Sequence, residues 1–366
     1  MTLTQSNDKV EGTYIMGGAS STIQGTVTKR KLNFTYKETT ASGKGWFELA
    51  SDGQSFEGQW LQSGQNDWQK WEGLRASFAL ASKGGEEIAG LWNSTYGMMR
   101  LMESPQGVEG IYGEENTIKG KFQKGKFLFS YQEPSVSGEG WFELSADKQQ
   151  ISGKWRPNGD KNWANWEGLR INPVSGISWL VVIETPWETS LLQSEYSFGS
   201  MLKSFFTRVP QVQVRQRIVN SEADLMKYLK EVVYLPEPSV VTLSSHGTAE
   251  GIRFGNKLVS TGTIIESLKF ASNLKLLHFG GCEIFKDGQM AASLKKKSPF
   301  PISGYKKAVD WAESAIFEFA YYEFLLARNM SVSHAVEQLR LIFPLASGKD
   351  IAGSPFKGMG FDIIYP

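Results

Sequence analysis

The sequence predicts two fold classes in one chain. The N-terminal half is expected to be an all-β antiparallel meander, barrel-like and built from two repeats, and the C-terminal half an α/β sandwich with a mostly parallel sheet. Nine of the 12 tryptophans fall before residue 170, so the halves differ in composition. Short alternating stretches separated by glycine fill the first half, as in antiparallel hairpins. After residue 176, continuous apolar runs alternate with helical patterns, as in parallel sheets.

An internal repeat organises the first half. Residues 43–60 (GKGWFELASDGQSFEGQW) match residues 138–155 (GEGWFELSADKQQISGKW) at an offset of 95 positions, and 68–75 (WQKWEGLR) match 163–170 (WANWEGLR). The segment LWNSTYGMMRL at 91–101 precedes the second copy, whereas only the stub MTLTQ precedes the first. We therefore expect the first copy to lack one strand, which the next unit could supply.

These boundaries predict the domain organisation. A tandem β-repeat domain is expected over residues 1–170, with copies at about 1–90 and 91–170. A linker, INPVSG, follows at 171–176, because proline and glycine stand there in a polar setting. The remaining residues, 177–366, are expected to form the α/β domain. The repeated tryptophans are interpreted either as a ligand platform or as hydrophobic filling, and their identical places in both copies favour filling.

The elements of the second half follow from apolar runs and capping signals. Ser221, with Asp224 three residues later, is expected to cap a helix that ends at Tyr234. A hairpin is expected at 249–260, with Gly255-Asn256 at its turn. The expected strands are residues 177–185, 211–220, 240–248, 274–279, 300–305 and 360–365, and the expected helices are residues 191–207, 263–271, 289–297 and a long helix from Trp311.

Two of these strands end in a potentially reactive residue beside glycine. The run VVTLSSHGT ends in His246-Gly247, and the run LKLLHFGGCEIF carries Cys282, the only cysteine, 36 positions later. The carboxyl edge of an open α/β sheet is where reactive groups usually lie. A thiolate is a nucleophile, and an imidazole can donate or accept the proton that peptide cleavage requires. The other two histidines, His278 and His334, lack this setting.

This pairing of a His-Gly strand end with a Gly-Cys strand end resembles the caspase-like cysteine peptidases, including the bacterial CHAT-type proteases. The resemblance covers roughly the last half of the chain. The caspase signature Q-A-C-[RQG]-G is absent, since the sequence reads Gly280-Gly281-Cys282-Glu283, which favours a bacterial caspase-like or CHAT-like relative over a true caspase. The resemblance implies a cysteine endopeptidase in which Cys282 attacks and His246 transfers protons.

The same resemblance implies the rest of the site. Backbone N–H groups of Gly247 and Cys282 would hold the oxyanion. The substrate pocket would involve Gly280, Tyr305 and Asp310, between the Cys282 strand and the loop KKAVDW, and a carboxylate there would favour arginine or lysine before the cut. Asp310 has an alternative role as the cap of the helix that begins at Trp311. If either lysine of the loop faced the pocket, the pocket would instead favour an acidic residue before the cut.

Composition limits the remaining possibilities. The net charge of +1 implies neither a nucleic acid nor a membrane as partner, and one cysteine excludes an internal disulfide or a cysteine-rich zinc site. The polar start MTLTQSNDKV has no signal-peptide pattern, and no apolar run approaches the about 20 residues of a membrane helix. We expect a cytoplasmic protein without cofactor or metal, acting on a protein or peptide, with a possible regulatory partner at the repeats. The alternative is a catalytically silent caspase-fold scaffold that binds through the tryptophan-rich repeats.

Overall fold

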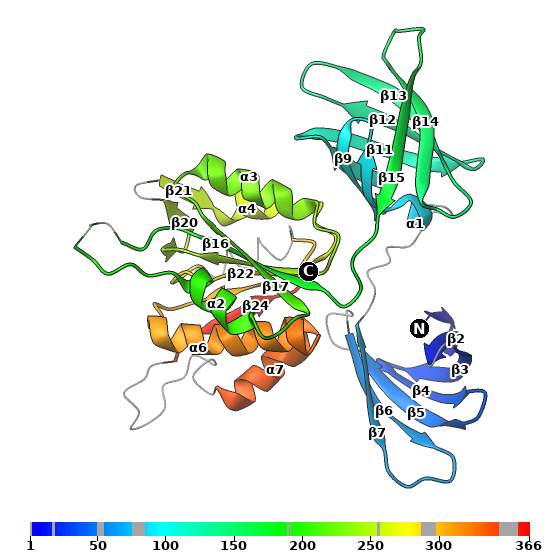
Figure 1. Ribbon diagram of the computed structural model, residues 1–366. Helices are drawn as coiled ribbons and strands as arrows, with labels where there is room; N and C mark the ends of the chain where they lie inside the picture. The colour runs from blue at the N-terminus through cyan, green and yellow to red at the C-terminus, as the bar shows by residue number, and fades with distance from the viewer. Residues whose placement is uncertain are drawn as a thin grey trace, which may run out of the picture. The chain divides into compact units, whose positions relative to one another are not determined.

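The computed structural model describes residues 2–16, 19–49, 55–74, 85–188, 190, 192–254, 257–286, 298–343 and 358–366 (Figure 1). The chain divides into two compact units, Met1–Ser77 and Phe78–Pro366, so the second repeat shares a unit with the α/β region. The coarse prediction is confirmed, because the repeats are all-antiparallel β structure and the C-terminal sheet is mostly parallel.

The first unit is an open seven-stranded antiparallel sheet in the order β1 to β7. Alternate residues of β4, namely Leu32, Phe34 and Tyr36, are buried on its apolar face, as the period of two requires. Its strands are β1 (Thr2–Ser6), β2 (Lys9–Met16), β3 (Ala19–Thr28), β4 (Lys31–Lys37), β5 (Ser42–Leu49), β6 (Ser55–Gln62) and β7 (Gln69–Leu74).

The second repeat forms a closed eight-stranded barrel in the order β10-β11-β12-β13-β14-β15-β8-β9. Its interior is filled by aromatic rings such as Phe127, Phe142 and Trp166, as the width of an eight-stranded barrel allows. The elements are the short helix α1 (Gly85–Ile88), β8 (Gly90–Ser94), β9 (Gly97–Ser104), β10 (Gly107–Tyr112), β11 (Asn116–Gln123), β12 (Lys126–Gln132), β13 (Ser137–Leu144), β14 (Gln150–Pro157) and β15 (Ala164–Ile171). Among the described residues, the first copy has seven strands, and none of them is a counterpart of β8.

The α/β region is built on a six-stranded sheet in the order β17-β16-β18-β22-β23-β24, in which only β24 runs antiparallel. A small antiparallel sheet, β19-β20-β21, follows β18 and contains the predicted hairpin. The strands are β16 (Ser178–Glu184), β17 (Val212–Ile218), β18 (Ser239–Ser244), β19 (Gly247–Thr248), β20 (Gly251–Phe254), β21 (Lys257–Ser260), β22 (Leu274–Phe279), β23 (Ile302–Tyr305) and β24 (Phe361–Ile364).

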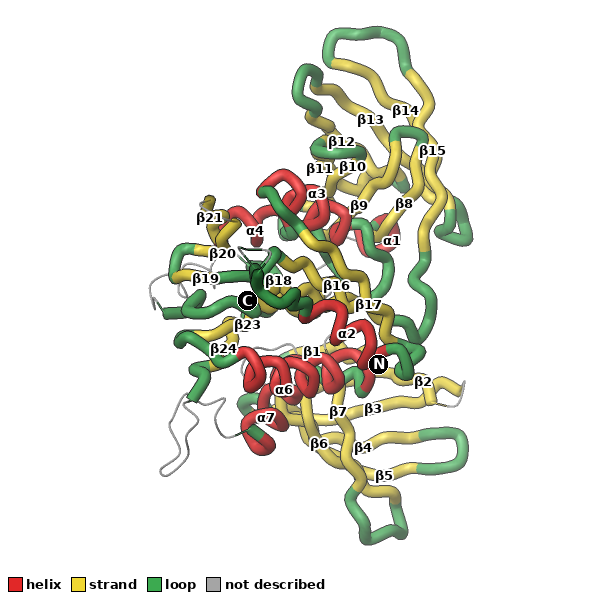
Figure 2. The backbone as a smooth tube through the Cα atoms, turned by 60° about the vertical axis from the view of Figure 1, so that its left-hand side comes forward, coloured by secondary structure: helices red, strands yellow, loops and turns green. Residues whose placement is uncertain are grey.

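Helices cover both faces of this sheet (Figure 2). One face carries α3 (Glu222–Val233) and α4 (Thr261–Ser267), and the other carries α2 (Phe198–Phe206), α6 (Trp311–Tyr322), the π-helical turn η1 (Glu323–Ala327) and α7 (Val332–Ile342). Ser221 caps α3 as predicted, with its side chain accepting from the Asp224 N–H. Helix α2, predicted over residues 191–207, starts only at Phe198, because Ser197 caps it. The predicted helix at 289–297 and the turn at 255–256 lie outside the described residues.

The barrel contacts the α/β region through the end of α3. Arg100 of β9 is buried, and its guanidinium donates to the carbonyls of Val233 at 3.0 Å and Leu235 at 2.8 Å. Burial lowers the pKa of Arg100 to about 10. The Tyr234 hydroxyl also donates to the Gly113 carbonyl at 2.8 Å. These contacts join the second repeat and the α/β region into one unit.

Replacing Arg100 by alanine is therefore expected to destabilise the second unit by about 1–3 kcal/mol, because the buried Val233 carbonyl loses the donor that Arg100 supplies and the Leu235 carbonyl keeps only the Asn273 amide. Arg156→Ala, which removes a partly exposed guanidinium paired with Glu139, is the matched control and should change stability little. Urea unfolding of the full chain, followed by far-UV circular dichroism, measures both. Equal midpoints for the two variants would contradict the docking role of Arg100.

Candidate active site

The strands that lead to His246 and Cys282 are neighbours in the centre of the sheet. β18 and β22 pair in parallel, with Leu243 opposite Phe279, and every residue of β18 is buried. Parallel neighbours end at the same edge of a sheet, so the turns that follow them emerge side by side. His246 is exposed and Cys282 is a free, partly exposed thiol. The structure therefore brings the two predicted residues to one edge.

Glycine allows the two turns to touch. The Gly280 N–H donates to the Leu243 carbonyl at 3.0 Å, which extends the pairing beyond the strand. A Cβ built on Gly247 would lie only 2.6 Å from the Cys282 carbonyl oxygen, and one on Gly281 would lie 2.7 Å from the Ser245 carbonyl oxygen. Side chains at either position would push the turns apart, so both glycines are required for this approach.

The His246 ring is packed against Trp187, which follows β16. The ring centroids are 4.8 Å apart in an edge-to-face arrangement. The Trp187 indole N–H donates to a Glu184 carboxylate oxygen at 3.2 Å. Together these contacts hold the imidazole from the side of β16, the strand next to β18.

Glu184 is the fixed point of that arrangement. Although it is buried, its carboxylate accepts from the backbone N–H groups of Phe198 at 2.7 Å and Gly199 at 3.2 Å, at the N-terminus of α2, where negative charge is favourable. The Ser197 hydroxyl and the Gln216 amide each donate to it at 3.0 Å. Sequence reasoning missed Glu184, although a carboxylate ending an otherwise apolar strand was a usable signal.

An aromatic row continues from Trp187 to the start of α6. The rings of Trp187 and Tyr196 lie 6.0 Å apart, and those of Tyr196 and Trp311 lie 4.3 Å apart. Trp311 is 43% exposed, so part of its side chain is accessible to a ligand. This row joins the candidate catalytic histidine to the segment that contains Asp310.

The turn that carries Cys282 is tied to the predicted pocket loop. The Phe285 N–H donates to the Tyr305 carbonyl at 3.0 Å, and the Glu283 N–H donates to the Lys307 carbonyl at 3.2 Å. The Lys306 ammonium is paired with Asp362 of β24 at 2.7 Å. The loop after β23 therefore lies beside the cysteine turn, as the pocket prediction requires.

Asp310 has the capping role that was its alternative assignment. Its carboxylate accepts from the N–H groups of Ala312 at 2.9 Å and Glu313 at 3.2 Å, and the residue is exposed. Capping uses one carboxylate oxygen, Oδ1, in both contacts. The capping role is confirmed, and the pocket role stays a prediction.

A buried polar cluster lies beneath the cysteine turn. Glu318 of α6 accepts from the Tyr305 hydroxyl at 3.0 Å and the Tyr322 hydroxyl at 2.9 Å, and His278 Nε2 lies 3.3 Å from its carboxylate. Burial, and then the neighbouring Glu318, raises the pKa of both tyrosines well above the usual range. A Cβ on the half-buried Gly280 would lie 3.6 Å from both Glu318 carboxylate oxygens. The Tyr305 side chain thus supports the site from within the core.

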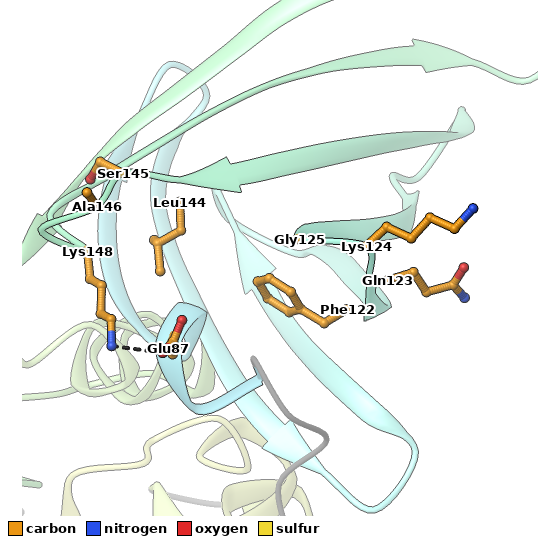
Figure 3. A pocket seen from close by; sticks show the side chains of 9 residues that line it. All are labelled: Glu87, Phe122, Gln123, Lys124, Gly125, Leu144, Ser145, Ala146 and Lys148. Atoms are coloured by element: carbon orange, nitrogen blue, oxygen red, sulfur yellow. Dashed lines mark hydrogen bonds and ion pairs between the residues drawn. The ribbon is translucent and has the colours of Figure 1, made fainter.

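A separate cavity of about 470 Å³ lies at one mouth of the barrel (Figure 3). The turns after β11 and β13 line it, and Lys148 pairs with Glu87 of α1 at 2.8 Å. No cluster of three or more potential metal ligands occurs among the described residues. Among them, too, no helix combines the length and apolar character needed to span a bilayer.

Comparison with known proteins adds no relationship: no family model matches the chain, and no curated protein matches it significantly.

Two adjacent glycines test the geometry of the site. Gly281→Ala is expected to destabilise the protein by about 1–3 kcal/mol and to disturb the Cys282 turn, because the new methyl overlaps a backbone carbonyl. In Gly280→Ala the nearest atom, the Leu243 carbonyl oxygen, is at an ordinary 3.5 Å, so this variant is the matched control. Melting temperature and the rate of Cys282 alkylation are the measurements. Equal behaviour of the two variants would contradict the close approach of the turns.

Proposed function

We propose that residues 177–366 are a caspase-like cysteine endopeptidase that uses Cys282 as nucleophile and His246 as general acid and base. The contact between the two glycine-flanked turns carries this proposal, because it places a free thiol and an exposed imidazole at one sheet edge. The strand order also supports the proposal, because the strands that lead to the histidine and the cysteine are neighbours in the sheet. Numbered along the chain, the strands lie in the order 2-1-3-4-5-6, with the histidine after strand 3, the cysteine after strand 4 and strand 6 antiparallel.

The reaction would proceed in two halves. The Cys282 thiolate attacks the scissile carbonyl carbon, and the resulting oxyanion is held by the backbone N–H groups of Gly247 and Cys282. Collapse breaks the C–N bond as His246 gives its proton to the departing amine, leaving a thioester. His246 then takes a proton from water, which attacks the thioester, and the acid and the thiol are released.

Trp187 and Glu184 would serve as positioning residues. The edge-to-face contact limits rotation of the His246 ring, and the hydrogen bond to buried Glu184 limits movement of the indole. Since one strand and one helix terminus hold Glu184, the orientation of His246 depends on the rigid sheet rather than on its own loop.

Several contacts favour an arginine before the cut. Of the two loop lysines that would favour an acidic residue, Lys306 is paired with Asp362. Asp310 supplies negative charge beside the loop, and the exposed Trp311 next to it can stack on a guanidinium. These groups therefore favour an arginyl side chain over an acidic one.

The alternative is a silent scaffold that binds through the tryptophan-rich repeats. In the barrel, Trp92 and Trp166 are fully buried, and Lys126 lies over the Trp141 ring at 3.8 Å. These tryptophans fill and brace the sheet, which supports the structural interpretation and weakens the alternative. We assign the repeats a regulatory or substrate-recruiting role, and the cytoplasm as the location of the protein.

The dyad makes a direct prediction. Cys282→Ala and His246→Ala are each expected to lower the rate of peptide cleavage by about a thousandfold or more, with little change in stability, because both side chains lie at the surface edge. His334→Ala, in α7, is the control and should retain cleavage. A fluorogenic peptide library provides the measurement. If purified Cys282→Ala protein cleaved the peptides as fast as the wild type, the mechanism would be refuted.

Specificity is tested by separating charge from capping at position 310. Asparagine caps helices about as well as aspartate, so Asp310→Asn should keep the melting temperature and remove the negative charge. The wild type is expected to prefer arginine or lysine before the cut, and the Asn variant to lose that preference. Peptides that differ only at that residue are the substrates. A wild-type preference for acidic or apolar residues, or an unchanged preference in the variant, would refute the pocket assignment.

A further inference from the structure

The first repeat has two free sheet edges where the second repeat has none. Among the described residues, β1 pairs only with β2 and β7 pairs only with β6. In the second repeat the corresponding strands, β9 and β15, both pair with β8, which lies between them and closes the barrel. In the described part of the first repeat, no strand therefore occupies the position equivalent to β8.

The second repeat shows what fits that place. β8 runs antiparallel to both neighbours, with Trp92 opposite Met99 on one side and Arg170 on the other. Trp92 and Met99 are fully buried in the barrel core. β8 contains no charged residue and reads GLWNS. The fitting strand thus combines uncharged residues with one large aromatic side chain that points inward.

Two side chains of the first repeat are more exposed than their counterparts in the closed barrel. Leu3 is 36% exposed, whereas Leu101, its counterpart at an offset of 98, is 1% exposed and lies opposite Gly90 of β8. Trp71 is partly exposed, whereas its counterpart Trp166 is 1% exposed.

Core positions away from the opening do not differ in this way. Ile23 and Ile118, another matched pair, are each 1% exposed, and Phe47 and Phe142 are 3% and 0% exposed. The first repeat thus has a formed core with a local opening, rather than loose packing throughout.

We propose that the first repeat is a peptide receptor that takes an extended segment of another protein as its eighth strand. The segment would run antiparallel to β1 and β7, satisfy both free edges through main-chain hydrogen bonds, and insert a tryptophan or similar aromatic side chain into the core between these strands, as Trp92 does in the barrel. A second copy of the chain cannot supply its β8, because both edges of that strand are already paired. This role does not depend on peptidase activity.

The probe is a fluorescein-labelled peptide of residues 88–96, IAGLWNSTY, titrated into the full chain carrying Cys282→Ala and followed by fluorescence anisotropy. Saturable binding is expected. The same peptide with alanine in place of Trp92 should bind about thirtyfold more weakly, since a buried tryptophan is a typical binding anchor.

A matched pair of protein variants locates the binding. Leu3→Glu, at the opening, should weaken binding, whereas Leu49→Glu, at a leucine of the same unit that is 40% exposed, should not. Thermal unfolding checks that both variants are folded. Absence of saturable binding, or equal binding by both variants, would overturn the proposal. A homodimer that Leu3→Glu dissociates, detected by light scattering, would also overturn it and assign the opening to a second copy.

Discussion

The close approach of two backbone turns at the carboxyl edge of the sheet is the constraint on which the site depends. Gly247 follows the histidine and Gly281 precedes the cysteine, and each lies where a Cβ would strike the backbone of the other turn. Because β18 and β22 are central, paired on both sides and buried, the positions of the turns are set by the sheet. The His246 and Cys282 side chains are more exposed than the strands that precede them, and this combination of rigid support and accessible groups is typical of α/β active sites.

Two buried carboxylates hold the surroundings of that edge. Glu184 joins the end of β16 to the N-terminus of α2 and, through Trp187, contacts His246. Glu318 joins α6 to β23 through Tyr305 and approaches β22 through His278. Removing a single donor from such a cluster would leave a buried charge undersatisfied, which is more costly than the hydrogen bond itself is favourable.

The sequence was sufficient for features that depend on local patterns. Apolar runs located the sheet strands, and Ser221 located the start of α3. Two apolar runs that end in glycine beside His246 and Cys282 predicted that both residues lie at the same sheet edge, because parallel strands end at one edge.

Features that depend on distant partners were not predictable. Nothing near Glu184 in sequence shows that Phe198, Gly199 and Gln216 supply its donors, and nothing near His278 shows that it lies against Glu318, 40 residues later. The start of α2 was misplaced because Ser197, which caps the helix, also donates to Glu184, a partner distant in the sequence. Hydrogen bonds from distant residues to a buried carboxylate leave no periodic signal along the sequence.

The central claim, that Cys282 is a nucleophile activated by His246, is tested most directly by the rate at which a peptidyl acyloxymethyl ketone with a terminal arginine labels the intact protein. Mass spectrometry is expected to place the adduct on Cys282, and His246→Ala should slow labelling by about a hundredfold or more, the usual contribution of a proton-transfer group. Iodoacetamide, which needs no peptide site, controls for simple thiol access. Failure to form the adduct, or equal labelling rates with and without His246, would contradict the account.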